Sequence, residues 1–338
     1  MVLPENIGLS ATLLLCFVWF LSLMPSVDPN SWDLWWTYDG ISGPDFWGMN
    51  KKWSHCALGR KQSPIDINPD ALLFDPGLEA IQIRGDLLQG KLHNNGRRLE
   101  LSVPDNASLV ITSGPLSYQY SINHIVFHYG REPDRGSEHT INGISFAGEI
   151  QLYFYNSQLY HNWSQAAQES NGLAAIAVLI QTPINVVDES GHNFNSQLKK
   201  ILQATEHIRH RDSHHTLEAI DVRQLLPTLD HYVTYEGSLT EPPCHETVQW
   251  IVLNKPIYVT DEQLSIIRNS INIDGDNFRP LQATNYRCVR TNIMRNFNKT
   301  FDEVPKIGDN QKNLGKRLCG NKGYVTYKAN FKKQTEVL

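Results

Sequence analysis

The stretch that decides the fold is INHIVFHYGREPDRGSEHTINGISFAGEIQLYFYN, residues 122–156. Its two ends, 122–129 and 148–156, are rich in β-branched and aromatic residues, and Gly, Pro, Asp and Asn lie between them. This pattern predicts two strands joined by a polar connection. Residues two apart on a strand share a face. The residues expected on the shared faces are His124, Val126 and His128 on the first strand and Glu149, Gln151, Tyr153 and Tyr155 on the second.

Three motifs in this stretch, F-H-Y-G, G-S-E-H-T-I-N-G and A-G-E-I-Q-L-Y-F-Y-N, resemble the core of the α-carbonic anhydrases in order and spacing. Those enzymes hold a catalytic zinc ion between two such strands through three histidines, two on the first strand and one on the second. The resemblance places the three positions at Val126, His128 and Gln151. One imidazole of three is therefore present.

The two missing imidazoles bear directly on function. A catalytic zinc ion needs strong donors to bind tightly and to lower the pKa of its water to about 7. Val126 supplies no donor atom, and the amide oxygen of Gln151 suits calcium or magnesium better than zinc. We therefore expect no zinc cofactor and no hydratase activity. The chain resembles the carbonic anhydrase-related proteins, and among them the secreted X/XI type.

The resemblance runs over residues 32–295 and implies a mostly β fold, with a large, twisted, mainly antiparallel central sheet and short peripheral helices. No linker composition interrupts this range, and 41% apolar residues is enough for one large core. We expect three parts along the chain. They are a signal peptide over 1–30, an α-carbonic anhydrase-like domain over 31–295 and a basic, disordered tail over 296–338.

The N-terminal segment is either a secretory signal or an uncleaved membrane anchor. Its apolar run, 7–24, contains three hydroxyl residues and is followed by Pro25 and Ser26 without a basic flank. These features favour a cleaved signal. We therefore expect a secreted protein with no stable membrane span after cleavage. Three N-x-S/T sequons agree with secretion, at Asn106, Asn162 and Asn298.

Four of the five cysteines lie beyond the expected signal, and secretion predicts that they are oxidised. Four cysteines allow three pairings, and their spacing does not choose among them. The resemblance implies a Cys56–Cys244 bridge, because secreted α-carbonic anhydrases join a cysteine before the Q-S-P strand to one after the T-x-P-P turn. For Cys288 and Cys319 an internal bridge is favoured over bonds to another chain, since an even count leaves no odd thiol.

Other cleft positions also follow from the resemblance. In the enzymes a Thr in the G-S-L-T-x-P-P turn hydrogen-bonds the zinc-bound hydroxide and passes its proton to a buried Glu, and this chain has both, as Thr240 and Glu138. The histidine proton shuttle that follows N-N-G is replaced by Arg97, which stays protonated at any working pH. The position after the Thr is usually a small hydroxyl residue, and a carboxylate at Glu241 would repel bicarbonate.

A tyrosine, Tyr153, stands where the enzymes have a small apolar residue in the carbon dioxide pocket. We expect its ring to fill that pocket and its buried hydroxyl to bond Gln151, Thr240 or Glu138. The alternative is that Tyr153 points past the cleft and only packs. The residues assigned to the cleft are Tyr38, Tyr153, Leu239 and Glu241.

Apolar patterns outside this stretch predict further elements. Residues 173–180 predict a buried strand, the apolar residues of 194–207 recur at helical spacing, and T-D-E-Q at 260–263 is a capping box that opens a helix. The segment H-I-R-H-R-D-S-H-H, residues 207–215, has four histidines. A metal site there is conceivable, but polar and charged neighbours favour a solvated loop.

These patterns lead to one functional hypothesis and one alternative. A net charge of −5 argues against a nucleic-acid-binding protein, which usually carries a basic face. We expect a secreted, catalytically inactive glycoprotein that binds a protein partner at cell surfaces, and the resemblance to the X/XI type points to neurexin-type synaptic receptors. The alternative is a weak zinc-dependent carbonate dehydratase in which His124 swings in to join His128 and Gln151.

Overall fold

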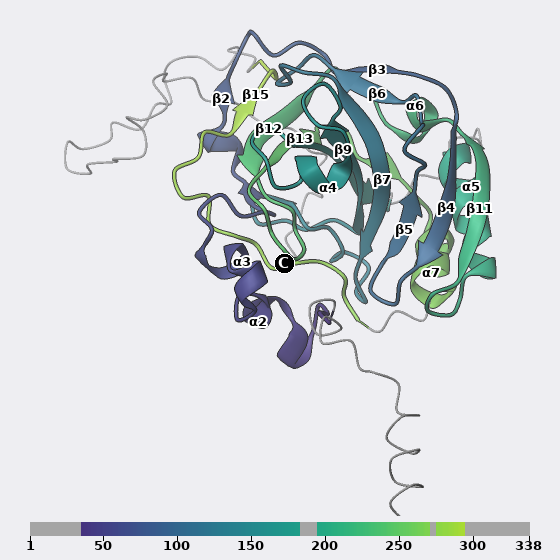
Figure 1. Ribbon diagram of the computed structural model, residues 1–338. Coiled ribbons are helices and arrows are strands. Elements are labelled where there is room, and N and C mark those ends of the chain that lie inside the picture. Colours follow the sequence, from purple (N-terminus) through teal and green to yellow (C-terminus); the bar gives the residue numbers. More distant parts are fainter. Residues whose placement is uncertain (1–34, 183–194, 271–274, 295–338) are drawn as a thin grey trace, which may run out of the picture. The chain divides into compact units, whose positions relative to one another are not determined.

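The structure is a computed structural model that describes residues 35–182, 195–270 and 275–294 (Figure 1). Contacts divide the chain between Trp36 and Thr37, and the architecture below is that of the unit that begins at Thr37. The predicted signal peptide, the predicted tail, Asn298 and Cys319 lie outside the described residues. No helix in the described ranges is both long and apolar enough to cross a membrane.

Most of the regular structure is β, and thirteen of the described strands form one sheet. Its main path runs β11-β4-β5-β7-β9-β10-β13-β12-β15-β2, while β14 pairs with β10, and β6 joins β3 to β7. A separate two-stranded sheet pairs β1 with β8. The bounds are β1 Asp66–Ile67, β2 Leu73–Phe74, β3 Gln82–Arg84, β4 Leu88–Asn94, β5 Leu99–Ser102, β6 Val110–Thr112, β7 Tyr120–Tyr129, β8 Thr140–Ile141, β9 Gly148–Asn156, β10 Leu173–Gln181, β11 His214–Ile220, β12 Tyr232–Gly237, β13 Val248–Leu253, β14 Ile257–Tyr258 and β15 Arg290–Thr291.

The predicted sheet is confirmed, because most neighbouring strands are antiparallel. Within the large sheet β10 pairs in parallel with β13 and with β14, and β15 with β2. The two strands predicted within residues 122–156 are β7 and β9, which pair with each other, and the run 173–180 forms β10 beside β9. In Figure 1 the long β7 and β9 lie side by side in the middle of the sheet.

Helices are short and lie at the periphery, as predicted. In Figure 1, α5, α6 and α7 lie on the side of β4 and β11, and α2 and α3 lie together at the lower left of the view. The bounds of the helices are η2 Gly40–Ser42, α2 Pro44–Trp47, η3 Lys51–Trp53, α3 His55–Leu58, η4 Pro69–Ala71, α4 Trp163–Ala166, α5 Ser196–Ala204, η5 Thr205–His207, α6 Val222–Leu225 and α7 Asp261–Ser270.

Local sequence explains the two longest helices. The apolar side of α5 is buried, and its N-cap Asn195 accepts hydrogen bonds from the amides of Gln197 and Leu198. The predicted capping box opens α7, since Thr260 and Gln263 exchange side-chain-to-amide hydrogen bonds. The prediction of a solvated loop over 207–215 is wrong at both ends, because His207 closes η5 and His214 opens β11.

The alternation predicted for β7 and β9 divides the buried side chains into two clusters. One face of β7 contributes Ile125, Phe127 and Tyr129 to the larger core, which also holds the apolar side of α5. The other face contributes Val126 to a second cluster, together with Tyr153 of β9. The candidate site lies on this second face.

Candidate functional site

The register of β7 and β9 fixes the floor of the site. Val126 lies opposite Gln151, and His128 lies opposite Glu149. The structure therefore brings together the three positions that the resemblance assigned to metal ligands. These three side chains and that of Glu149 are all buried.

Gln151 is the centre of a buried hydrogen-bond network. Its amide nitrogen donates to Glu138 Oε2 and to Glu149 Oε1, both at 2.8 Å. Because two carboxylates face the nitrogen, the amide oxygen must point the other way, where it accepts from the Tyr153 hydroxyl at 2.7 Å. The same oxygen lies 3.1 Å from His128 Nε2. All the hydrogen-bonding capacity of this side chain is used within the protein.

The one remaining imidazole, His128, is held at both of its nitrogens. Nδ1 donates to the backbone oxygen of Asn277 at 2.6 Å. Nε2 faces the Gln151 oxygen, and Glu138 Oε2 lies 3.6 Å away. The nitrogen that would bind a metal is thus met by acceptor oxygens.

Two buried carboxylates surround this network, and each has several donors. Glu138 Oε1 accepts from the Arg279 amide at 2.9 Å. Glu149 accepts from the His139 amide and from His139 Nδ1, both at 2.8 Å. Burial alone would raise the pKa of the Glu149 carboxyl, but the His139 ring beside it holds that pKa below its ordinary value. The sequence placed Glu149 on the inward face but gave no sign of its partner.

The Tyr153 ring fills space on the floor rather than pointing past it. It is buried, and its centroid is 5.8 Å from that of Trp250. Thr240 is a further hydrogen-bonding neighbour of its hydroxyl. Burial, with the nearby Glu138 carboxylate, raises the pKa of Tyr153 far above its usual range, so this hydroxyl remains a donor. Leu239 is buried in the same apolar cluster.

His124 lies opposite Tyr153, two register positions away from the pair formed by Val126 and Gln151. Its ring stacks on the Tyr153 ring at 4.9 Å with 15° between the planes, and its Nδ1 is 2.8 Å from Asn123 Oδ1. Burial lowers the pKa of His124 to about 4. His124 is therefore an uncharged, packed side chain whose ring is held by an aromatic neighbour.

An ion-pair cluster, formed by Arg98, Glu100 and Glu241, lies beside the floor. Arg98 Nε and Nη2 donate to Glu100 Oε2 at 3.1 and 2.7 Å, and Arg98 Nη1 pairs with Glu241 Oε2. Burial would raise the pKa of Glu100, yet Arg98 holds it at about 2. Sequence reasoning named Glu241 but missed Arg98. Arg98 directly precedes β5, two residues before Glu100, and this spacing in extended chain was the available signal.

The remaining cleft residues lie within electrostatic range of one another. Tyr38 is half-buried, and its ring meets the edge of Trp47 at 5.9 Å. Burial, and after it the Glu138 carboxylate, raises the pKa of Tyr38, while Arg98 and Arg97 act in the opposite direction. Arg97 is half-buried, and burial together with the neighbouring Arg98 lowers its pKa.

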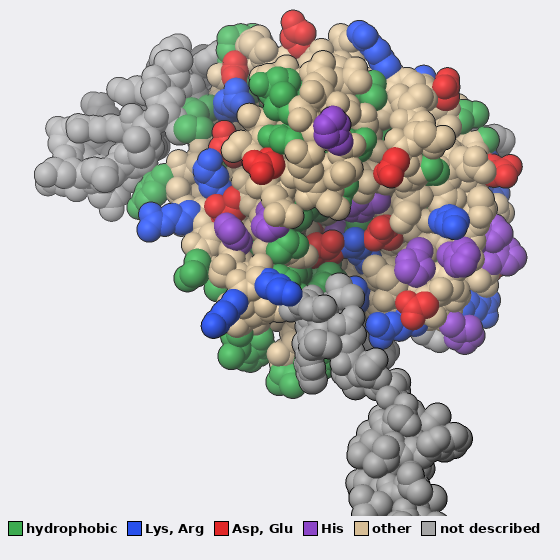
Figure 2. Space-filling model, viewed as in Figure 1, with side chains coloured by type: hydrophobic (Ala, Val, Ile, Leu, Met, Phe, Trp, Pro, Cys, Tyr) green, Lys and Arg blue, Asp and Glu red, His purple; other side chains and the backbone are tan. Residues whose placement is uncertain are grey.

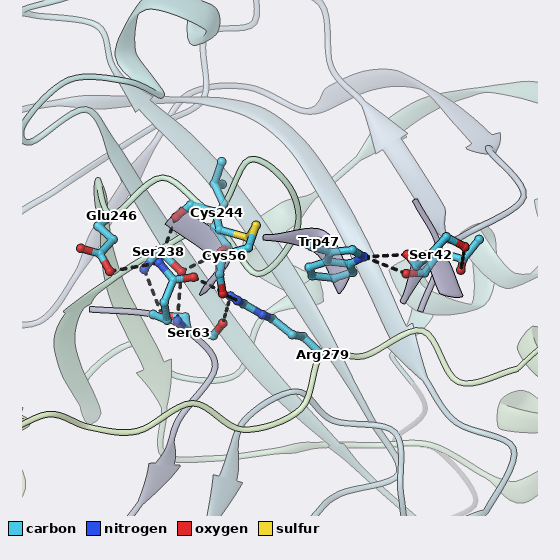
Figure 3. The surroundings of a disulfide bond; sticks show 11 residues. Ser42, Trp47, Cys56, Ser63, Ser238, Cys244, Glu246 and Arg279 are labelled. Atoms are coloured by element: carbon cyan, nitrogen blue, oxygen red, sulfur yellow. Dashed lines mark hydrogen bonds between the residues drawn. A yellow bond between two sulfur atoms is a disulfide. The ribbon is translucent and has the colours of Figure 1, made fainter. Parts of the chain in front are cut away.

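The predicted bridge between Cys56 and Cys244 is confirmed (Figure 3). Arg279 points toward it and donates to the backbone oxygens of Cys56 and Ser63 at 3.0 and 2.8 Å. The guanidinium also lies over the ring of Trp47, 5.6 Å from its centroid. Since the Arg279 amide binds Glu138, one residue connects the bridge to the network.

Three further sites predicted for a secreted chain fall within the described residues. Cys288 takes part in a disulfide, although its predicted partner lies outside the described ranges. Asn106 and Asn162 are exposed, as glycan attachment requires. Asn162 is also the N-cap of α4, where its side-chain oxygen accepts from the Gln165 amide at 3.0 Å.

The donors at the floor do not match those of a catalytic zinc ion. Three protein ligands plus water are usual, and here one imidazole faces an amide oxygen while Val126 offers no donor. Throughout the described ranges, no group of three or more His, Cys, Asp or Glu side chains has the geometry to hold a metal ion.

Comparison with known proteins identifies relatives over most of the chain. The family model of the eukaryotic-type carbonic anhydrases matches residues 42–293. "Putative carbonic anhydrase-like protein 2" of Caenorhabditis elegans is 38% identical over 272 residues, which cover 76% of this chain and 78% of that protein. "Putative carbonic anhydrase-like protein 1" of the same organism is 32% identical over 335 residues, covering 76% of this chain and 90% of that protein.

Proposed function

The chain belongs to the eukaryotic-type carbonic anhydrase family, and we propose that it is a secreted member without hydratase activity that acts by binding a protein at cell surfaces. The motifs of the sequence resemble those of the non-catalytic X/XI type, and the proposal follows that resemblance. The first part of the proposal concerns lost chemistry, which the cleft geometry supports. The second part concerns the partner, which rests on the resemblance.

The observation that carries the proposal is the position of Gln151. This residue stands where the family has a ligand histidine, and its amide is bonded to Glu138, Glu149 and Tyr153. For a zinc ion to bind here, His128 would have to leave the Gln151 oxygen, and the ion would still lack two of its three nitrogen ligands. Because these buried bonds would be broken for a weak set of donors, zinc binding is disfavoured.

Substrate and proton transfer meet separate obstacles. By resemblance Tyr153 stands at the position of the family's carbon dioxide pocket, and its ring is buried beside Trp250. Glu241 is paired with Arg98, so a carboxylate stands beside the inherited Thr240. A cation at Arg97 cannot accept and release protons as a histidine does. Three steps of the reaction are thus opposed by different residues.

The alternative, a weak zinc-dependent dehydratase, requires His124 as a replacement ligand. In the structure this histidine pairs with Tyr153 across the two strands, and its ring stacks on that tyrosine. Moving it next to Gln151 would require a change of strand register. No feature of the described cleft favours that change.

Secretion is supported by the sulfur chemistry and by the sequons. A disulfide between Cys56 and Cys244, and a further one at Cys288, are expected in an oxidising compartment. The exposed sequons at Asn106 and Asn162 are accessible to glycosylation. The partner is then an extracellular or membrane-anchored protein, and the X/XI resemblance makes neurexin-type receptors the first to test.

Two experiments test the two parts. Carbon dioxide hydration is measured by stopped flow with and without a zinc chelator, and the expected rate equals that of buffer. A chelator-sensitive rate that disappears in His128→Ala would overturn the proposal that the protein is inactive.

Binding to a partner is measured by surface plasmon resonance against a neurexin ectodomain, with an unrelated adhesion receptor as the control. Equal signals for both receptors would contradict the proposed partner and would leave the proposal of an inactive cleft unaffected.

A further inference from the structure

Five histidines form a patch on the surface of the protein, apart from the buried floor of the cleft. Figure 2 shows histidine side chains gathered over the side of the molecule where Figure 1 draws β4 and β11. Each of the five is exposed or half-buried, unlike His128. The members of this histidine patch are His93, His207, His210, His214 and His215.

Strand alternation sorts the two adjacent histidines of β11 onto opposite faces, and each meets another histidine. His214 lies opposite His93 of β4 in the antiparallel register. His215 faces the other way, toward η5, and its ring stacks on that of His207 with centroids 4.6 Å apart and 19° between the planes. The dipeptide therefore belongs to two separate histidine pairs.

The His207–His215 pair is accessible to an ion from solvent. His207 is exposed and His215 is half-buried, so solvent reaches the pair. Within the described part of the chain, neither ring is hydrogen-bonded to another protein group. Two nitrogens bound to one ion at about 2.0 to 2.1 Å each lie roughly 3 to 4 Å apart. An ion must lie in the plane of each imidazole that binds it, so the two rings have to turn out of their near-parallel stack before both nitrogens can meet one ion.

The elements that carry the pair are firmly placed. β11 is hydrogen-bonded to β4, and η5 directly follows α5, whose Leu198, Ile201 and Leu202 are buried in the core. A preorganised pair of ligands loses less conformational entropy when it binds an ion than two ligands on flexible loops. The fold thus sets the spacing between the two histidines, and only their side chains have to turn.

We propose that His207 and His215 form a surface site for a divalent transition-metal ion. Imidazole is a favoured ligand of Cu²⁺, Ni²⁺ and Zn²⁺, and the usual order of affinities makes Cu²⁺ the tightest of these. The site supplies two protein nitrogens, and water completes the coordination sphere. This agrees with the lack of any group of three metal-binding side chains in the described ranges.

The site is distinct from the cleft, and the difference is testable. At the cleft His128 is buried and engaged by Asn277 and Gln151. At the patch both rings are open to solvent. Metal bound by the protein is therefore expected to depend on His207 and His215 and to be indifferent to His128.

Isothermal titration of the full-length mature protein with Cu²⁺ alone, and separately with Zn²⁺ alone, tests the proposal. One tight site is expected. Its Kd should rise by more than about tenfold in His207→Ala/His215→Ala, because both metal–nitrogen bonds are lost. Electron paramagnetic resonance of the Cu²⁺ form should show coupling to two nitrogens, which disappears in the same variant.

The matched control is His93→Ala/His214→Ala, which removes two histidines of the same patch from the opposite face of the sheet. It should retain the tight site. Loss of binding in the control but not in the test variant would overturn the proposal, and so would loss only in His128→Ala. Binding that none of these variants changes would be adventitious and would also overturn it. Unfolding midpoints close to that of the parent protein confirm that each variant is folded.

Discussion

The cleft floor and the histidine patch both contain histidines that lie on β-strands or next to them. The two regions differ in what surrounds the ring nitrogens. On the floor, His128 is buried, and both nitrogens face protein oxygens at 2.6 and 3.1 Å. In the patch, His207 and His215 stack on each other and are accessible to water. On the proposals made above, burial and neighbouring acceptors, more than the inherited position of a histidine, decide whether it can bind a metal.

A second difference concerns the framework beneath each region. The floor is connected through Glu138 and Arg279 to the Cys56–Cys244 bridge, whereas the patch rests on β4, β11 and α5. Changes that loosen the bridge should therefore disturb the floor first. Changes in the patch should leave the floor intact.

The largest effect on stability is expected from the bridge. Cys56 and Cys244 are 188 residues apart in the sequence. In the chain-entropy model, removing a cross-link of that span lowers the free energy of unfolding by about 5 kcal/mol. Cys56→Ser/Cys244→Ser should show this loss in urea unfolding relative to the parent protein. A loss below about 1 kcal/mol would mean that the bridge does not brace the domain.

Restoring histidines at the two positions where the family has metal ligands should give the cleft floor affinity for zinc. In Val126→His/Gln151→His, three imidazoles converge on the floor, and zinc affinity should rise by about a thousandfold or about 4 kcal/mol. Hydration of carbon dioxide should stay near the buffer rate, because Tyr153 and Arg97 are unchanged. Competition with a colorimetric chelator measures the affinity. An active enzyme from these two substitutions alone would show that Tyr153 does not obstruct the substrate.

Removing the central amide should cost far more than removing a patch histidine. Gln151→Leu leaves Glu138 and Glu149 without a shared donor and removes the oxygen to which the Tyr153 hydroxyl donates. The expected loss in the free energy of unfolding is about 3 to 5 kcal/mol. The matched surface change, His207→Ala, should alter it by less than about 0.5 kcal/mol. Similar losses in denaturant titrations of the two variants would break the comparison.

Acid should weaken the ion-pair cluster in a defined range. The pKa of Glu100 is held at about 2, below its ordinary value of 4.5. A depressed carboxyl pKa stabilises the fold above the unfolded-state pKa, so this contribution is complete above pH 4.5 and is lost as pH falls toward about 2. It amounts to at most about 3 kcal/mol. The stability difference between the parent protein and Glu100→Gln should shrink over that range, and a constant difference would contradict the assignment.

Much of the floor could be predicted because it is organised by strand alternation and by a known family pattern. The shared face of Val126 and His128, the pairing of β7 with β9, and the Cys56–Cys244 bridge were all predicted, the bridge from the resemblance. Gln151 was among three partners expected for the Tyr153 hydroxyl. These features depend on residues close in sequence or on an inherited arrangement.

The features that were missed depend on contacts between distant segments. Arg98 pairs with Glu241, which comes from the turn after β12, and no local pattern selects this partner. Arg279 reaches from the closing segment to Cys56. The His207–His215 pair was hidden for another reason, since residues 207–215 are polar enough to be read as a loop although their ends belong to η5 and β11.

The central claim is that the cleft floor does not hold zinc, and zinc content tests it most directly. Protein of the His207→Ala/His215→Ala variant, which lacks the proposed surface site, is saturated with Zn²⁺, dialysed and analysed by mass spectrometry of the metal. The account predicts far less than one zinc per chain, with no further change when His128→Ala is added. One zinc per chain that is lost on adding His128→Ala would contradict it.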